Sequence, residues 1–115
     1  MIKQYEIWLA DLNPRKGTEP GKIRPVLVIQ TNLLNSASHP STIVCPMTTK
    51  IKKGLELMRV FLVKGTANVD YDCEIMIDQI RAIDNARLLS KIGELPDDLK
   101  GKVRKNVISI LDLEI

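Results

Sequence analysis

The sequence predicts a mainly β fold with one helix at the C-terminus. Short runs of branched aliphatic residues recur between loops rich in Gly, Pro, Asn and Asp, and helical periodicity is clear only after Pro96. The 115 residues are 44% hydrophobic and 27% charged, which is typical of a compact globular domain rather than a disordered chain. We therefore expect residues 1–115 to form a single domain.

The composition also argues against several classes of protein. No apolar run reaches the roughly 20 residues that cross a membrane, and residues 1–6 do not resemble a signal peptide, so we expect a cytoplasmic protein without a membrane partner. Cys45 and Cys73 lie inside apolar runs and are expected to be buried thiols rather than a disulfide. His39 stands in a loop without Cys or carboxylates at ligand spacing, so no metal or other cofactor is predicted, and His39 is left out of the site.

The first two predicted strands flank a loop. Residues 5–11 form the first strand, and residues 12–22, with two prolines and two glycines, are too interrupted for any element. Five apolar residues from Pro25 to Ile29 predict a second strand, over 24–30, that is buried on both faces. Pro25 suits the start of a strand and holds Arg24 in an extended conformation, so the Arg24 guanidinium is fixed at the mouth of a rigid strand. An ordinary surface Arg and a functional one both fit this position.

The middle of the chain predicts two more strands. Residues 31–40 are a polar connection, and residues 41–48 form a third strand whose end Pro46 turns into an edge or a bulge. Residues 48–54, Thr-Thr-Lys-Ile-Lys-Lys-Gly, fit either a phosphate contact or an ordinary hydroxyl-capped turn. Residues 56–63 form a fourth strand, which we expect to pair with the third as a hairpin.

The last third combines a strand and a helix. Residues 73–77 predict a fifth strand that continues through 78–84, whereas residues 85–95 give no firm prediction. Pro96 and two following aspartates favour a helix start, and apolar residues then recur at helical spacing, namely Leu99, Val103, Val107, Ile110 and Leu111. Five or six short strands and a terminal helix predict a small, closed or nearly closed β-barrel of the SH3-like kind.

The charge is unevenly distributed along the chain. The net charge is +3, but residues 1–64 carry ten Lys or Arg against four Asp or Glu, whereas residues 65–98 carry three against eight. A basic first half favours an anionic partner, such as a nucleic acid or an acidic peptide. Charge blocks in sequence need not remain patches after folding, so an ordinary solvated surface stays an alternative.

Three segments, in this order, resemble one family. Gly17-Thr18-Glu19-Pro20-Gly21-Lys22-Ile23 leads into Arg24-Pro25-Val26-Leu27-Val28-Ile29-Gln30, then comes Cys45-Pro46-Met47-Thr48, and later Asp78-Gln79-Ile80-Arg81-Ala82-Ile83-Asp84. The chain is similar over nearly its whole length to the MazF/PemK (Kid) endoribonuclease toxins of type II toxin–antitoxin systems. The Arg-Pro strand followed by Asp-Gln-any-Arg is the most discriminating part.

The resemblance implies a fold, an activity and partners. It implies a homodimer of barrels of the CcdB/MazF/Kid type that cuts single-stranded RNA, usually mRNA, at short sequences without a metal. The products carry a 2′,3′-cyclic phosphate and a 5′-hydroxyl. A cognate antitoxin would neutralise the toxin by laying an acidic segment along the RNA groove.

The resemblance also implies roles for individual residues. Arg24 and Thr48 match the family's catalytic Arg and Ser/Thr. Gln79 matches a conserved groove Gln that contacts RNA, and Glu19 matches a loop Glu seen in several members, so both are candidates for a catalytic or supporting role. RNA-binding residues are expected at Lys22, Thr49, Lys50, Lys52, Lys53, Asp78 and Arg81. One position departs from the PemK/Kid branch, which has an important Arg where this chain has Met76. The arrangement of the MazF branch is therefore the expected one.

The chemistry of these side chains fits RNA cleavage. Attack by the 2′-hydroxyl builds up negative charge on a phosphorane, which the forked guanidinium of an Arg can bind at two oxygens. A Thr hydroxyl can donate to a non-bridging oxygen in the same way. Arg is a poor general base because its pKa lies above ~12. Glu19 could take this role, or the hydroxyl could lose its proton without a dedicated group.

Two other functions remain as alternatives. The chain could be a non-catalytic toxin that inhibits a protein target, as the gyrase poison CcdB does, but CcdB acts through a C-terminal segment with a Trp and this chain has only Trp8. It could also be an inactive RNA-binding barrel, against which the presence of both Arg24 and Thr48 argues.

Overall fold

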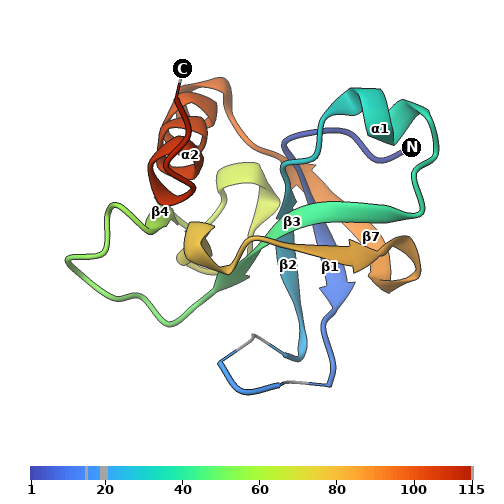
Figure 1. Ribbon diagram of the computed structural model, residues 1–115. Helices are drawn as coiled ribbons and strands as arrows, with labels where there is room; N and C mark the ends of the chain where they lie inside the picture. The colour runs from blue at the N-terminus through green and yellow to red at the C-terminus, as the bar shows by residue number, and fades with distance from the viewer. Residues whose placement is uncertain (15, 19–20, 115) are drawn as a thin grey trace.

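Figure 1 shows the computed structural model, which describes residues 1–14, 16–18 and 21–114. Its elements confirm a mainly β fold with a C-terminal helix. In chain order they are β1 (Glu6–Asp11), β2 (Ile23–Val28), α1 (Asn32–Ser36), β3 (Ser41–Thr48), β4 (Arg59–Leu62), the 3-10 turn η1 (Thr66–Asn68), β5 (Cys73–Met76), the 3-10 turn η2 (Ile77–Gln79), β6 (Arg81–Asp84), the 3-10 turn η3 (Asn85–Arg87), β7 (Leu88–Glu94) and α2 (Asp97–Ile110).

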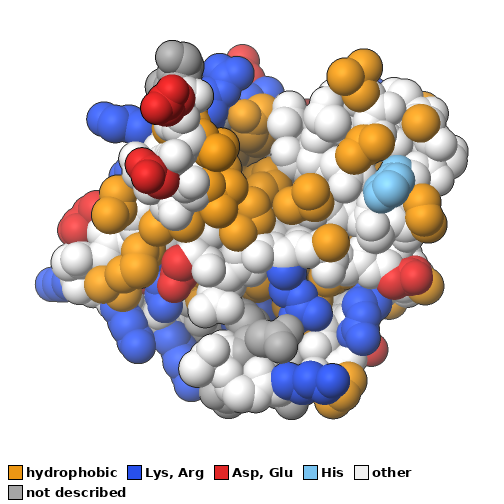
Figure 2. Space-filling model, viewed as in Figure 1, with side chains coloured by type: hydrophobic (Ala, Val, Ile, Leu, Met, Phe, Trp, Pro, Cys, Tyr) orange, Lys and Arg blue, Asp and Glu red, His pale blue; other side chains and the backbone are white. Residues whose placement is uncertain are grey.

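The strands form one antiparallel path in the order β4-β5-β3-β2-β1-β7, and β6 pairs with another part of β3. Within the described residues no pairing joins β4 to β7 at the two ends of this path. The sheet is therefore open, and the expected closure of a barrel is not confirmed. Long loops follow β1 and β3; in Figure 1 the first extends to the bottom of the molecule and the second to the left. In the same view, Lys and Arg side chains gather over this lower part, and apolar side chains cross the centre between the two helices (Figure 2).

The strand β2 is buried on both faces, as its apolar run predicts. Leu27 joins the larger apolar cluster, whereas Val26 and Val28 point to a second cluster on the other face. All three side chains are fully buried. The backbone of β2 is therefore a rigid base for Arg24, its second residue.

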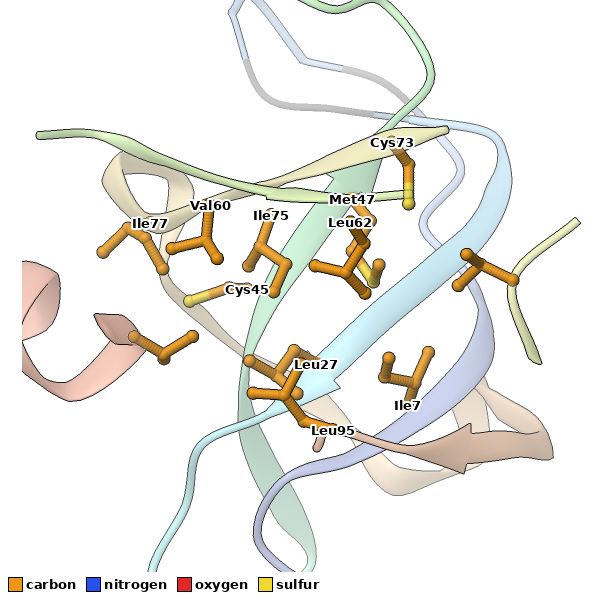
Figure 3. Close-up of a cluster of buried hydrophobic side chains, with 12 residues drawn as sticks. Ile7, Leu27, Cys45, Met47, Val60, Leu62, Cys73, Ile75, Ile77 and Leu95 are labelled. Atoms are coloured by element: carbon orange, nitrogen blue, oxygen red, sulfur yellow. The ribbon is translucent and has the colours of Figure 1, made fainter. Parts of the chain in front are cut away.

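The larger cluster joins the strands to the terminal helix. Figure 3 shows side chains from β1 to β5, among them Ile7, Leu27 and Ile75, converging on one centre. Val103 of α2 is buried in the same cluster. Cys45 and Cys73 are free and buried, as predicted.

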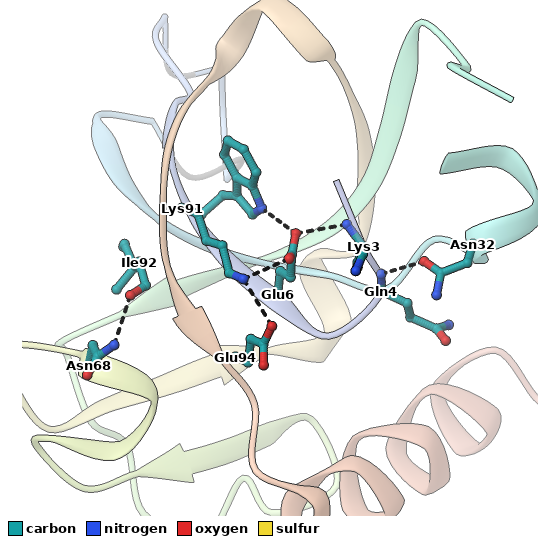
Figure 4. A network of polar contacts seen from close by, with 9 residues as sticks. Lys3, Gln4, Glu6, Asn32, Asn68, Lys91, Ile92 and Glu94 are labelled. Carbon is teal, nitrogen blue, oxygen red and sulfur yellow. Dashed lines mark hydrogen bonds and ion pairs between the residues drawn. The ribbon is translucent and has the colours of Figure 1, made fainter. Parts of the chain in front are cut away.

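A buried carboxylate ties the N-terminal segment to β7 (Figure 4). Glu6 is only 4% exposed, and its Oε1 accepts hydrogen bonds from the Trp8 indole (3.0 Å) and from the Lys3 backbone N–H (2.8 Å). Its Oε2 lies 2.9 Å from the ammonium of Lys91, which also pairs with Glu94. A buried carboxylate needs such partners, because an isolated one would be strongly destabilising.

The predicted hairpin of the third and fourth strands is wrong. β4 pairs with β5, and β5 pairs with the end of β3, so β5 lies between the two strands that follow each other in sequence. The ten-residue connection over 49–58 has the length that lets a third strand enter between them.

The long fifth strand predicted over 73–84 is interrupted. β5 pairs with β3 at Met47 and Thr48, β6 pairs with it from Ser41 to Val44, and η2 separates the two. Cys45 and Pro46 of β3 pair with neither β5 nor β6. Pro46 has no backbone N–H that could donate a hydrogen bond to a neighbouring strand. β3 is therefore a central strand, and Pro46 marks an interruption in its pairing on this side rather than an edge of the sheet.

Two elements were not predicted from the sequence. The polar connection over 31–40 contains the short helix α1, whose N-cap Thr31 accepts a side-chain hydrogen bond from the Leu33 N–H. Residues 88–94 form β7, which pairs with β1. In the part of the chain that the structure describes, neither α-helix has the length and apolar character needed to cross a membrane.

Candidate nucleic-acid interface

A cleft of about 640 Å³ opens where the start of β2 and the end of β3 meet the long loops. The strands contribute rigid walls, and the connections over 12–22, 49–58 and 63–72 contribute the rims. Its described lining comprises Leu9, Thr18, Gly21, Lys22, Ile23, Arg24, Pro25, Met47, Thr48, Thr49, Lys50, Lys52, Arg59, Asn68, Val69, Asp70, Tyr71, Cys73, Met76 and Ile92.

Arg24 is held in the cleft by backbone carbonyls. Its Nε donates to the carbonyl of Gly21 at 2.9 Å, and its Nη1 donates to the carbonyl of Met47 at 3.2 Å. The second bond joins β2 to the residue just before Thr48, so the guanidinium and the hydroxyl are brought together by the same strand end. The half-buried guanidinium is thus oriented before any ligand arrives.

Thr48 ends β3 with its side chain in the same cleft. Its Oγ1 accepts a hydrogen bond of 3.1 Å from the Lys50 N–H, which is the hydroxyl-capped turn that the sequence allowed. Accepting this bond occupies a lone pair and leaves the hydroxyl proton to donate. Thr48 can therefore both shape the lysine loop and donate to an anion.

The cleft is strongly basic. Among its described lining residues, five are cations, and Asp70 is the single anion. The cations are Lys22, Arg24, Lys50, Lys52 and Arg59. Such an excess attracts a phosphate backbone and releases its counterions on binding.

Comparison with known proteins identifies the family. Residues 3–111 match the model of the PemK-like, MazF-like toxin of type II toxin–antitoxin systems. The chain belongs to this toxin family.

Curated relatives and a solved structure agree with the family. The chain is 38% identical over 103 residues to the endoribonuclease EndoA of Bacillus subtilis, which covers 90% of this chain and 88% of that protein. It is 36% identical to the endoribonuclease MazF of Staphylococcus saprophyticus over 115 residues, or 100% of this chain and 92% of the relative. The crystal structure of MazF from Deinococcus radiodurans matches with a TM-score of 0.82 and 25% identity, and each chain is covered to 97%.

Six of the site residues predicted from the sequence lie around this one cleft. They are Lys22, Arg24, Thr48, Thr49, Lys50 and Lys52. Lys53, Asp78, Gln79 and Arg81 are described but do not line it: Lys53 is exposed in the β3–β4 loop, and the other three belong to η2 and β6. Glu19 lies outside the described residues. Met76, at the position where the PemK/Kid branch has an Arg, does line the cleft.

Two cleft features were not predicted from the sequence. Arg59 lines the cleft from β4, and the loop over 68–71 adds Asn68, Asp70 and the 68% exposed ring of Tyr71. In the sequence, Arg59 and Phe61 alternate with the inward-facing Val60 and Leu62, and this alternation could have predicted that Arg59 points away from the core. The position of the 68–71 loop had no such signal, because it depends on β7.

Neither a thiol nor a metal site is indicated at the cleft. Burial, followed by the charges of Asp72 and Glu74, raises the pKa of the Cys73 thiol to about 11, so this cysteine is protonated at neutral pH and a poor nucleophile. In residues 1–14, 16–18 and 21–114, no three His, Cys, Asp or Glu side chains are grouped as metal ligands.

Proposed function

We propose that this toxin is a metal-independent, sequence-specific endoribonuclease that cleaves single-stranded RNA, and mRNA in particular, by attack of a 2′-hydroxyl on the adjacent phosphate. The products would carry 2′,3′-cyclic phosphate and 5′-hydroxyl ends. The observation that supports this most directly is that Arg24 and Thr48, 24 residues apart in sequence, line one basic cleft. The relatives named above as endoribonucleases support the same activity.

The two side chains have complementary roles in this proposal. Arg24 binds the non-bridging oxygens of the scissile phosphate and stabilises the charge of the phosphorane, because its orientation is fixed by the Gly21 and Met47 carbonyls. Thr48 donates its hydroxyl proton to one of these oxygens. Glu19 is the proposed base for the 2′-hydroxyl, with direct loss of the proton to water as the alternative.

The remaining predicted residues are proposed to bind the RNA strand on either side of the reacting phosphate. Lys22, Thr49, Lys50 and Lys52 line the cleft and would hold the nearest phosphates. Lys53, Asp78, Gln79 and Arg81 do not line it, so we propose that they contact nucleotides beyond it.

The positive charge of the cleft also predicts how an antitoxin would bind. The family consists of toxins from type II toxin–antitoxin systems, so we propose a cognate antitoxin whose acidic segment occupies the basic cleft and excludes RNA. We also propose that the chain is one SH3-like domain that works as a homodimer in the cytoplasm. The continuous antiparallel path from β4 to β7, together with α2, supports the single domain.

The test is cleavage of a defined transcript by the purified protein in EDTA, followed by mapping of the RNA ends. We expect cleavage to survive EDTA and to fall on the order of 10²–10³-fold in Arg24→Ala and in Thr48→Ala. Cleavage that persists in Arg24→Ala would refute the assigned site. RNA binding without cleavage by the wild type would favour the inactive RNA-binding barrel, and growth inhibition without either would favour a toxin that inhibits a protein.

A further inference from the structure

A second guanidinium lies in the cleft, and the proposed mechanism does not use it. Arg59 begins β4, and its partner in the register with β5 is Met76, so both side chains stand on the face of the sheet that lines the cleft. Val60 and Ile75 pair next to them and point into the core. The position of Arg59 thus follows from strand alternation.

A buried carboxylate holds Arg59 in place. Its Nη1 lies 3.1 Å from Oε1 of Glu74, and the same nitrogen donates to the Lys50 carbonyl at 3.2 Å. The Glu74 side chain is 8% exposed, and its Oε1 also accepts the Lys52 N–H at 3.0 Å. One carboxylate oxygen therefore fixes both the guanidinium and the backbone of the lysine loop.

The other nitrogens of Arg59 remain accessible. Nη1 of Arg59 is the atom that donates to the Lys50 carbonyl and to Glu74. Among the described residues, no fully buried side-chain N or O atom lacks a hydrogen-bond partner. Nε and Nη2 must therefore contact solvent, although the Arg59 side chain is only 13% exposed. Nε and Nη2 can therefore donate to an anion in the cleft while Nη1 stays bound to Glu74 and to the Lys50 carbonyl.

We propose that Arg59 binds a phosphate of the RNA beside the one that Arg24 and Thr48 act on, and that Glu74 is a positioning residue that orients Arg59. This inference rests on the proposed function, because it assumes that the cleft takes RNA. It assigns a binding role to Arg59 and not a part in the chemical step.

The experiment measures RNA affinity against salt concentration. Cleavage sites are first mapped with the wild type on a defined transcript. A short oligonucleotide of that sequence, with a 2′-deoxy nucleotide at the attacking position so that it is not cut, is then titrated with each variant by fluorescence anisotropy. The slope of log Kd against log salt counts phosphate contacts, at about 0.7 for each contact on a single strand.

The variants separate binding from positioning. For Arg59→Ala we expect a Kd about tenfold higher or more and a slope reduced by about 0.7. For Glu74→Gln we expect a higher Kd with the wild-type slope, because the guanidinium is still present but less well oriented. Arg104→Ala is the matched control, since Arg104 is exposed on α2 and does not line the cleft, and we expect it to leave both values unchanged.

The inference and the proposed function fail in different ways. Suppose that the wild type cleaves RNA and that Arg59→Ala folds with the wild-type slope and the wild-type Kd. The role of Arg59 is then refuted, and the proposed function is not affected. If Arg59→Ala does not fold, Arg59→Gln, which can still donate to the Lys50 carbonyl, is judged by the same slope. Absence of cleavage by the wild type would instead refute the proposed function.

Discussion

Backbone groups help to orient two side chains at the cleft. The Arg24 guanidinium is held by two carbonyls, and the Thr48 hydroxyl is held by the Lys50 N–H. Strand ends present such carbonyls and N–H groups in fixed directions, so orientation costs little entropy when RNA binds. Substitutions at these residues are therefore expected to affect the reaction more than stability.

The hydroxyl of Thr48 can be tested by two substitutions of similar size. Thr48→Val keeps the branched shape but removes the hydroxyl, and with it both the donor to the phosphate and the acceptor of the Lys50 N–H, so we expect kcat for RNA cleavage to fall on the order of 10²–10³-fold. Thr48→Ser keeps a hydroxyl, and we expect it to retain most of the activity. Equal losses in the two variants, measured by single-turnover cleavage, would contradict a donor role.

The Glu6 carboxylate gives a prediction for acid stability. Burial by itself raises the pKa of Glu6, but hydrogen bonds from Trp8, Lys91 and Lys3 outweigh it and hold the pKa below its ordinary value. The unfolded state then binds the proton more readily, so this carboxylate stabilises the fold above the unfolded-state pKa, and the contribution is lost as the pH falls through the folded-state pKa.

We expect Glu6→Gln to lower the free energy of unfolding at pH 7 by about 1–3 kcal/mol, since hydrogen bonds to a charged group are lost. The difference from the wild type should shrink below the unfolded-state pKa. Urea unfolding of both proteins at several pH values measures this. A constant difference across the range would show that the charge of Glu6 is not responsible.

Among the elements, the contact of β7 with η1 links the fold to the cleft. A Cβ at Gly93 of β7 would lie 2.2 Å from the Ala67 carbonyl oxygen of η1, which is too close for any side chain. Asn68 of the same turn donates from its side chain to the Ile92 carbonyl at 3.1 Å, and both residues line the cleft. The loop over 68–71 therefore depends on the absence of a side chain at Gly93.

Two glycine-to-alanine substitutions test this contact. Gly93→Ala should destabilise the fold by about 1–3 kcal/mol, because backbone must move away from backbone, and should also raise KM by displacing the 68–71 loop. Gly101→Ala in α2, where nothing lies within 4 Å of the new Cβ, should instead stabilise by about 0.5–1 kcal/mol. Thermal unfolding and cleavage kinetics measure both, and a neutral Gly93→Ala would refute the close contact.

The whole molecule assembles the cleft from distant segments. Residues near positions 22, 48, 59 and 70 meet there, and only the antiparallel order of the sheet brings them together. Because the strands share a core with α2, loss of any part should loosen the cleft as a whole.

We expect one cooperative unfolding transition, with the same midpoint from Trp8 fluorescence and from far-UV circular dichroism, as for a single domain. If the protein is a homodimer, the midpoint should rise with protein concentration, and the mass in solution should be twice 12.9 kDa. Two transitions would argue against the single domain, and a concentration-independent midpoint with a monomer mass would argue against the dimer.

The sequence by itself determined the features that depend on neighbouring residues. Five consecutive apolar residues after Arg24 favoured a buried strand, in which Val26, Leu27 and Val28 are fully buried, and the spacing of Leu99, Val103 and Val107 predicted the terminal helix. The order of short motifs was enough to predict the family, whereas the catalytic roles of Arg24 and Thr48 stay a prediction.

Only the tertiary structure decided which strands pair and which side chains share the cleft. The last predicted strand is split at η2, opposite Cys45 and Pro46 of β3, and β5 lies between β3 and β4. The pairing between β4 and β5 therefore placed Arg59 at the cleft and Glu74 within reach of its guanidinium. Local propensity carries no information on such pairings, because their free energy comes from contacts between segments that are far apart in the chain.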